Sequence, residues 1–289
     1  MSGAEIAQGH NSAFVDKQNR SFVVYHTRFS NGGEGHQVRV HQLFLNDEGW
    51  LMAAPFEFDG ETITDGAIAS KASIADAEIA GDYQFMRHQY GQNTKAKAFE
   101  TPVNITLNAD GTITGAEKGT WKRTAGTDYI HLTINNVVYR GVLVKQTVDY
   151  TNIPAIAISA LSSSSGSVAL GQNNFTYQQE VWAVKADAKA AIKYTLSKMT
   201  LPFSDGATLN AAPSLPVQGK MGANISWKSS DTSILTDEGK VKGKGKVTMT
   251  MTISKDEYEY VKDYSLNIDA EAEETTPVYY PVSALKNTT

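Results

Sequence analysis

Alternation of apolar and polar residues is the most regular pattern in the chain, and it predicts short β-strands. The segment Gln37–Leu45 alternates most clearly, which gives the predicted strand two different faces: Val38, Val40, Gln42 and Phe44 on one, and Arg39, His41, Leu43 and Leu45 on the other. Turn-forming residues flank it at 30–35 (SNGGEG) and 46–49 (NDEG). Further strands are predicted at 13–15, 22–26 and 50–54, so residues 1–56 make an antiparallel sheet of about four strands, the size of one propeller blade.

A second series of strand-like runs follows, separated by turn residues at near-regular intervals. The runs are Gly81–Arg87, Val103–Leu107, Thr112–Gly115, Tyr129–Ile134, 137–144, 155–160 and 176–184. Asp110-Gly111 and Asn135-Asn136 lie between such runs, and both pairs can adopt the positive φ angles that tight hairpins need. About eight short strands in this order predict an antiparallel barrel over residues 57–186.

The composition changes after residue 186. Residues 186–191 (ADAKAA) either continue a strand or form one helical turn, and alternating strands are predicted at 224–231, 237–241 and 246–253. Residues 270–289 read as a linker or tail, since they begin with AEAEETT and continue into PVYYP. The predicted fold class is therefore all-β.

Composition and charge exclude several classes of protein. The hydrophobic content of 41% is that of a globular chain, and the formal net charge of −5 comes from interspersed charges, which argues against binding to nucleic acid. No run approaches the roughly 18 apolar residues of a membrane span, and residues 1–11 are too short and polar for a secretory signal. With no cysteine, a metal would need histidine, carboxylate or carbonyl ligands.

Several motifs, in order, carry a resemblance to a known family. The motifs GHNS (9–12), VYHTRF (24–29) and VRVHQ (38–42), followed by GW (49–50) and AP (54–55), resemble the last blade of the five-bladed propeller of bacterial endo-arabinanases of glycoside hydrolase family 43. The series GDYQF, DGTITG, GTW, YRGV and VWAV resembles the small β-barrel domain that follows the propeller in those enzymes. The motifs NISWKSSD and DEGKV resemble a bacterial immunoglobulin-like β-sandwich with Trp227 as its core tryptophan.

The resemblance implies a domain order and a function. It implies the last blade of an incomplete propeller at 1–56, the barrel at 57–186, an immunoglobulin-like domain at 187–269 and a tail at 270–289. The family hydrolyses α-1,5-linked arabinan with inversion, using two aspartates and a glutamate carried on earlier blades, and no position of this chain matches those three carboxylates. Asp16, Asp47 and Glu48 are predicted to be solvated turn residues.

Two consequences follow for partners. The expected partners are arabinan and an N-terminal propeller fragment or chain that carries the catalytic carboxylates, and the expected location is the cell surface or the secreted fraction of a bacterium. Without that fragment, Val38, Val40 and Phe44 are predicted to face water. The alternative is a non-catalytic cell-surface protein that binds polysaccharide or acts as a spacer.

Candidate site residues are concentrated in residues 9–58. The resemblance implies that His10 contacts one largely hydrated calcium ion, although calcium normally prefers oxygen ligands. Arg39 and His41 share a strand face, which favours a supporting hydrogen-bond network near the propeller axis and a possible contact from Arg39 to substrate. A zinc site from His26, His36 and His41 is the alternative. The aromatic residues that could stack on sugars are predicted to pack in the core instead: Trp50, Trp121, Trp182 and Tyr25.

Overall fold

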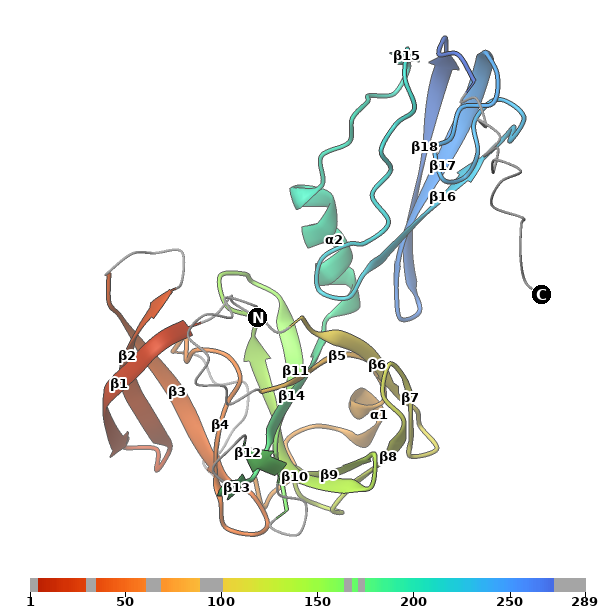
Figure 1. Ribbon diagram of the computed structural model, residues 1–289. Coiled ribbons are helices and arrows are strands. Elements are labelled where there is room, and N and C mark those ends of the chain that lie inside the picture. The colour runs from red at the N-terminus through yellow and green to blue at the C-terminus, as the bar shows by residue number, and fades with distance from the viewer. Residues whose placement is uncertain are drawn as a thin grey trace, which may run out of the picture. The chain divides into compact units, whose positions relative to one another are not determined.

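The computed structural model describes residues 5–29, 35–60, 69–88, 101–163, 168–170 and 175–272. The chain forms two compact units, the first mainly up to Tyr194 and the second mainly from Thr195 onward. Strands dominate both units, which confirms the all-β prediction; the helices among the described residues are α1 (Asp76–Ile79) and α2 (Ala188–Lys198) (Figure 1). The predicted loop at 30–35 and the predicted tail beyond 272 lie almost entirely outside the described residues.

The first four strands form one antiparallel sheet in chain order. They are β1 (Glu5–Val15), β2 (Ser21–Phe29), β3 (Gln37–Leu45) and β4 (Leu51–Ala53), drawn red to orange in Figure 1. The turn between β1 and β2 is held by Asp16, whose carboxylate accepts hydrogen bonds from the amides of Gln18 and Arg20 at 2.9 and 2.8 Å. The Asn46 side chain holds the β3–β4 turn by accepting from two backbone amides. These side chains fix the hairpin registers.

The β3 face that carries Phe44 corrects one prediction. Val38 is exposed as expected, but Phe44 is buried together with Met52, and both pack against Val142 and Val144 of the barrel. The end of this face at Phe44 is thus covered by the following domain, so its burial does not depend on other propeller blades.

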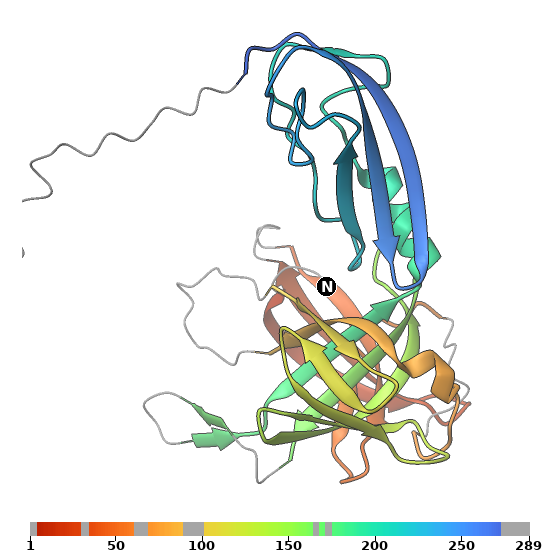
Figure 2. The ribbon, with the colours of Figure 1, turned by 90° about the vertical axis from the view of Figure 1, so that its right-hand side faces the viewer.

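Eight described strands close into an antiparallel barrel (Figure 2). Their order around the barrel is β10–β11–β14–β5–β6–β7–β8–β9, and β9 pairs with β10. The bounds are β5 (Gly81–Arg87), β6 (Val103–Leu107), β7 (Thr112–Gly115), β8 (Gly119–Arg123), β9 (Tyr129–Ile134), β10 (Val137–Thr147), β11 (Pro154–Ser162) and β14 (Glu180–Ala186). A separate hairpin, β12 (Val168–Leu170) and β13 (Phe175–Tyr177), precedes β14.

Strand alternation explains the barrel core. In β9, Ile130, Leu132 and Ile134 are completely buried, whereas the residues between them are only partly covered. Each such side chain contributes roughly 1.5–3 kcal/mol by leaving water. The hairpin from β9 to β10 turns at Asn135 and Asn136, whose φ angles of 52° and 65° confirm the predicted positive values.

Two barrel predictions were incomplete. The strand β8 was not predicted, because GTWKR carries little alternation, and only its fit against β9 explains it: a Cβ on Gly119 would lie 1.9 Å from the carbonyl oxygen of Thr133. The run 176–184 was predicted as one strand, but the structure divides it into the end of β13 and the start of β14.

The helix α2 follows β14 directly. The prediction allowed at most one helical turn, but AKAAIKYTLSK forms a helix of 11 residues. Alanine and lysine favour helix, and the Asp187 carboxylate accepts from the amide of Ala190 at 2.7 Å, which satisfies one of the free amides of the first turn. No helix within the described ranges has the length and apolar character of a membrane span.

The second unit contains one four-stranded sheet in the order β15–β18–β17–β16. Its strands are β15 (Thr208–Leu209), β16 (Asn224–Ser229), β17 (Gly245–Lys255) and β18 (Tyr258–Ile268). Trp227 is buried as predicted; its indole nitrogen donates to the carbonyl of Pro216, and its ring lies near Phe203 and Tyr264.

Two strand predictions in this unit were wrong. The predicted strand at 237–241 is a turn with a single bridge from Leu235 to Val241. The strand β18 was not predicted, because its first half is mostly exposed and lacks alternation.

Candidate functional site

Arg39 and His41 lie on the same face of β3, and both side chains are buried. The guanidinium of Arg39 donates to Glu57 at 2.8 Å, to the side-chain oxygen of Gln37 at 3.0 Å, and to the hydroxyl of Tyr150. His41 uses one ring nitrogen to bond the carbonyl of Ala54 at 2.8 Å. The structure therefore places Arg39 in a network that joins β3 to the β10–β11 connection.

The other ring nitrogen of His41 lies 3.2 Å from the hydroxyl of Tyr25, and the two rings stack with centroids 5.7 Å apart. Tyr25 is thus a half-buried packing partner, as predicted, rather than an exposed platform for a sugar. With both nitrogens engaged, His41 has a supporting position in the sheet.

A cavity of about 170 Å³ lies beside Arg39, lined by residues 57–59 and 147–151. Its two walls are tied together by side-chain bonds. Gln146 accepts from the amide of Phe56 at 3.1 Å and donates to its carbonyl at 2.9 Å, and Asp149 accepts from the amide of Glu57 at 2.9 Å. Burial raises the pKa of Asp149, although this amide, His41 and Arg39 act in the opposite direction.

Tyr150 is the residue of this site that sequence reasoning missed. It sits in the β10–β11 connection with its side chain 75% exposed and with a backbone φ of 59°, in the left-handed region that non-glycine residues seldom adopt. The Arg39 guanidinium lies 5.8 Å from its ring centroid, within cation–π range. An aromatic residue inside the turn sequence VDYTN is the signal that could have drawn attention to it.

The GHNS motif forms an irregular part of β1. The pairing with β2 shifts on both sides of Gly9, and His10 is exposed with a φ of 50°. The ring of His26 lies between those of His10 and His36, at centroid distances of 6.1 and 4.8 Å. These three histidines come together, whereas His41 bonds to Ala54 instead, so the alternative set of His26, His36 and His41 is not assembled.

Metal ligation by protein groups alone has little support in this part of the chain. Within the described ranges, no group of three or more histidine or carboxylate side chains is arranged to hold a metal ion. His10 could supply one contact only, with the remaining ligands coming from water or from residues outside those ranges.

The turn carboxylates lie where the sequence predicted, but they are paired. Asp16 forms an ion pair with Arg20 at 2.6 Å. Asp47 contacts His131 at 2.6 Å and Arg140 at 3.0 Å, and Glu48 contacts Arg140 at 2.9 Å. As predicted, all three lie in or beside turns, and Asp47 and Glu48 are exposed. Their ion pairs also join the β1–β2 turn internally and the β3–β4 turn to the barrel.

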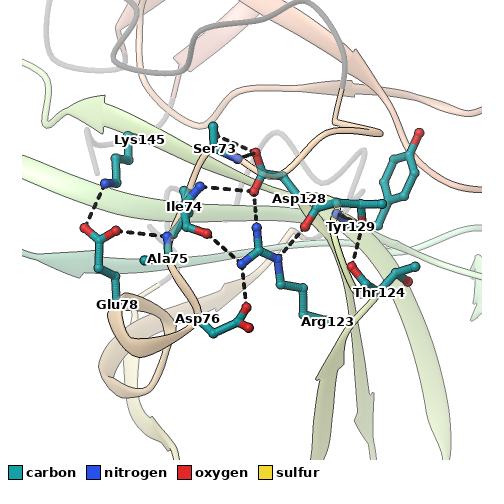
Figure 3. Close-up of polar contacts among 11 residues, drawn as sticks. Ser73, Ile74, Ala75, Asp76, Glu78, Arg123, Thr124, Asp128, Tyr129 and Lys145 are labelled. Carbon is teal, nitrogen blue, oxygen red and sulfur yellow. Dashed lines mark hydrogen bonds and ion pairs between the residues drawn. The ribbon is translucent and has the colours of Figure 1, made fainter.

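A second arginine cluster has Arg123 and Asp128 buried at its centre (Figure 3). Arg123 pairs with buried Asp128 at 2.7 Å and with Asp76 at 2.6 Å, and it also donates to the carbonyl of Ile74 at 2.6 Å. Asp128 accepts from both the amide and the hydroxyl of Ser73, at 2.9 and 2.6 Å. This cluster ties the segment before α1 to β8 and β9.

Helix α1 is tied to the barrel by the same group of contacts. Lys145 donates to Glu78 at 2.7 Å, and this hydrogen bond holds the pKa of Glu78 below its usual range. The other oxygen of Glu78 accepts from the amide of Ala75 at 3.0 Å (Figure 3). The role of these contacts is structural, because every polar group is directed at another part of the same fold.

The three tryptophans of the first unit, Trp50, Trp121 and Trp182, occupy different environments. Trp121 packs against the barrel core and donates to the carbonyl of Asn108, as predicted. Trp182 donates to Glu180 at 2.9 Å and lies 4.2 Å from the ring of His88; burial lowers the pKa of His88 to about 4. Trp50 is about half exposed at the β3–β4 turn, so the prediction that it packs in a core was wrong.

Comparison with known families found a match for each of two regions of the chain. Residues 55–171 match the family of GH43 C-terminal lipocalin-like domains, and this stretch contains seven of the eight barrel strands, from β5 to β11. The barrel therefore resembles a GH43 C-terminal lipocalin-like domain. Residues 186–271 match the family of atrophied bacterial immunoglobulin domains, which accords with the single sheet and buried Trp227 of the second unit.

Characterised relatives of the GH43 domain are arabinanases. An extracellular endo-alpha-(1->5)-L-arabinanase of Thermotoga petrophila is 44% identical over 146 residues, which cover 49% of this chain and 28% of that protein. Extracellular endo-alpha-(1->5)-L-arabinanase 2 of Bacillus subtilis is 37% identical over 164 residues, which cover 56% of this chain and 32% of that protein. The predicted resemblance to family 43 arabinanases is confirmed.

Solved structures agree with these relatives. The crystal structure of endo-1,5-alpha-L-arabinanase from Thermotoga petrophila RKU-1 in complex with TRIS aligns with a TM-score of 0.51 and 37% identity, covering 63% of this chain and 37% of the other. The glycoside hydrolase family 43 YxiA protein from Bacillus licheniformis aligns with a TM-score of 0.50 and 34% identity, covering 63% and 36%. The chain thus spans about a third of the length of these relatives.

Proposed function

We propose that this chain forms the C-terminal part of a glycoside hydrolase that cleaves α-1,5-linked arabinan with inversion. The observation that carries the proposal is the similarity of 146 and 164 residues of this chain to about a third of each of two arabinanases. Inverting hydrolysis needs a carboxylic acid and a carboxylate roughly 6.5–9.5 Å apart. In this proposal, propeller blades outside the chain supply both groups, on the same or on a second polypeptide.

Exposed apolar residues on the first sheet support a role as a propeller blade. Six large hydrophobic side chains of β1, β3 and β4 or their turns are about half or more exposed: Phe14, Val15, Val38, Leu45, Trp50 and Leu51. Such a concentration is unusual for a surface that stays in water, and β1 lies at one edge of the sheet. Packing against neighbouring blades on both faces of the sheet would cover these side chains.

Residues of this chain would then close one side of the active centre. Arg39 and His41 would hold the sheet and the β10–β11 connection in place through their hydrogen bonds, so that their role is positioning. Arg39 could additionally bond a substrate hydroxyl only by exchanging one of its present partners.

We also propose that His10 contacts a calcium ion that stays largely hydrated. Its exposed ring and bulged backbone fit a single contact, and the donor set described here fits no complete protein cage. The ion would supply positive charge near the reacting bond when bound. Replacement of His10 by alanine in the assembled enzyme should reduce bound calcium, measured by metal analysis, and should shift the calcium dependence of activity; unchanged metal content would refute the assignment.

The proposed function is tested by reconstitution. The purified chain alone should not hydrolyse linear arabinan, and addition of the four preceding blades of an arabinanase propeller should restore release of arabino-oligosaccharides. Turnover by the chain alone, with contaminating hydrolase excluded, would refute the division of the active site. Because both relatives are named extracellular, we place the assembled enzyme outside the cell or on its surface.

A non-catalytic polysaccharide-binding protein is the second candidate. The immunoglobulin-like domain and the exposed Tyr150 beside a cavity favour this role. Arabinan binding that persists without cleavage after the propeller blades are added would support it over the enzyme.

A further inference from the structure

The cavity beside Tyr150 has no part in the hydrolysis proposed above. We infer that it binds a single neutral sugar residue and that, resting on the proposed function, this residue is an arabinofuranosyl unit of arabinan. The site would hold polysaccharide on the barrel, separate from the bond being cleaved. Four features of the cavity support this inference: its size, its polar lining, the position of Tyr150 and the hydrogen bonds that hold its walls.

The size of the cavity limits the ligand. A volume of about 170 Å³ is below the roughly 300–1,000 Å³ of sites that enclose drug-sized ligands. It suits one monosaccharide unit of a longer chain, with the neighbouring units outside. A nucleotide or a folded peptide segment would not fit.

The lining favours a ligand rich in hydroxyl groups and without negative charge. Three of the lining residues, Glu57, Asp59 and Asp149, carry carboxyl groups, which accept hydrogen bonds, and no lysine or arginine is among the described residues of the lining. Sugar hydroxyls are donors for such acceptors, whereas a uronic acid would be repelled. Phe58 and Val148 are the apolar residues of the lining.

Tyr150 supplies an aromatic surface at the edge of the cavity. Its hydroxyl is bonded to Arg39, while the side chain remains largely exposed, so the ring is oriented but not covered. The turn places it third in a Val148–Thr151 turn closed by a 3.0 Å backbone bond, where a positive φ normally selects glycine or asparagine. Holding a tyrosine at a positive φ costs free energy, and residues strained in this way are concentrated at functional sites.

The walls are tied to one another by hydrogen bonds within the chain. The segment 56–59 is joined to the strand β10 and the following turn through Gln146 and Asp149, and the amide of Phe58 donates to the carbonyl of Val40 at 2.8 Å. A ligand would therefore not have to order these segments, and less of its binding energy would be lost on entry.

The test uses the full chain and isotope-edited NMR titration with α-1,5-arabinotriose, galactotriose, a galacturonic acid trimer and calcium chloride. Arabinotriose should shift the amide signals of 57–59 and 147–151. A Tyr150→Gly variant should keep its fold, since glycine accepts the positive φ, and should bind arabinotriose about tenfold more weakly or worse. Trp50→Ala is the control, because it removes an exposed aromatic ring from the opposite end of β3.

Each outcome decides between the alternatives. Loss of affinity in Tyr150→Gly with retention in Trp50→Ala supports the site. No binding of any trimer by the natural chain, equal binding by Tyr150→Gly, or a response to calcium or galacturonic acid alone overturns it. Tyr150-dependent binding of galactotriose in preference to arabinotriose would keep the sugar site but reject arabinan as its ligand. Hydrolysis of arabinan by the reconstituted enzyme without binding to this cavity would leave the proposed function intact and refute only this inference.

Discussion

The clusters around Arg123 and Arg39 differ in how exposed the partners of each arginine are. The side chains of Arg123 and Arg39 are 8% and 9% exposed, and each pairs with a carboxylate at under 3 Å. The main partner of Arg123 is Asp128, which is only 3% exposed, whereas Arg39 bonds to Glu57, at 28%, and to the largely exposed Tyr150. The buried pair of Arg123 and Asp128 adds stability to the fold. The bond from Arg39 to the exposed Tyr150, beside a cavity, can instead hold a binding group in position.

The largest expected effect comes from opening the enclosed cluster. Asp128→Ala should destabilise the barrel by about 3–5 kcal/mol, because it leaves the buried charge of Arg123 without its main partner. Asp76→Ala is the matched control on the same arginine; as Asp76 is 89% exposed, the loss should stay below about 1 kcal/mol. Urea unfolding of both variants measures the difference, and equal losses would show that enclosure does not distinguish the two carboxylates.

The effect of burying a titratable group that has no ion pair with a described residue can be measured at His88. Burial lowers the pKa of His88 to about 4, so between about pH 6.5 and 4 the unfolded chain binds a proton that the folded chain does not. Stability should therefore fall as the pH is lowered through this window, by up to about 3 kcal/mol. Urea unfolding at several pH values measures the slope. His88→Phe should flatten it, and an unchanged slope would assign the pH dependence to other groups.

A smaller effect is expected from the open cluster. Arg39→Met should destabilise by about 1–2 kcal/mol, because Glu57 and Tyr150 recover contact with water when the guanidinium is lost. Arg39→Lys is the control that keeps the charge without the planar fork that reaches three partners. If Arg39→Met is as damaging as Asp128→Ala in urea unfolding, the two clusters are energetically equivalent.

The smallest expected effect separates backbone strain from the side chain at Tyr150. Tyr150→Gly and Tyr150→Ala both remove the ring and its bond to Arg39, but only glycine accepts the φ of 59° without strain. The glycine variant should be the more stable by about 1 kcal/mol. Thermal unfolding of the pair measures this, and equal midpoints would mean that the turn relaxes once the ring is removed.

Local signals predicted much of the barrel. The strand Tyr129–Ile134 and the turn at Asn135-Asn136 could be predicted from sequence. The alternation of side chains and the positive φ angles depend only on residues that are neighbours in the chain. The burial of Phe44 was not predictable in the same way, because it depends on Val142 and Val144, which lie about a hundred positions later. The pattern marked Phe44 as apolar and could not identify what would cover it.

The cavity was out of reach of sequence reasoning for the same reason. Its two walls are separated by 90 residues along the chain, as the bond between Phe56 and Gln146 shows. Arg39 and His41 were found because they share one strand, but the contact of Arg39 with Tyr150 spans 111 residues. A turn tyrosine acquires significance only when the fold brings it to an arginine on another sheet.

Closure of the barrel has a consequence for how neighbouring parts of the chain can attach to it. Because β9 pairs with β10, each barrel strand has neighbours on both sides, and a sequence joined before or after the barrel does not compete for its backbone hydrogen bonds. The first sheet and the sheet of the second unit are accordingly separate from the barrel in strand pairing. Whatever holds the first sheet against the barrel must therefore come from side chains, such as Phe44 with Val142 and Asp47 with His131.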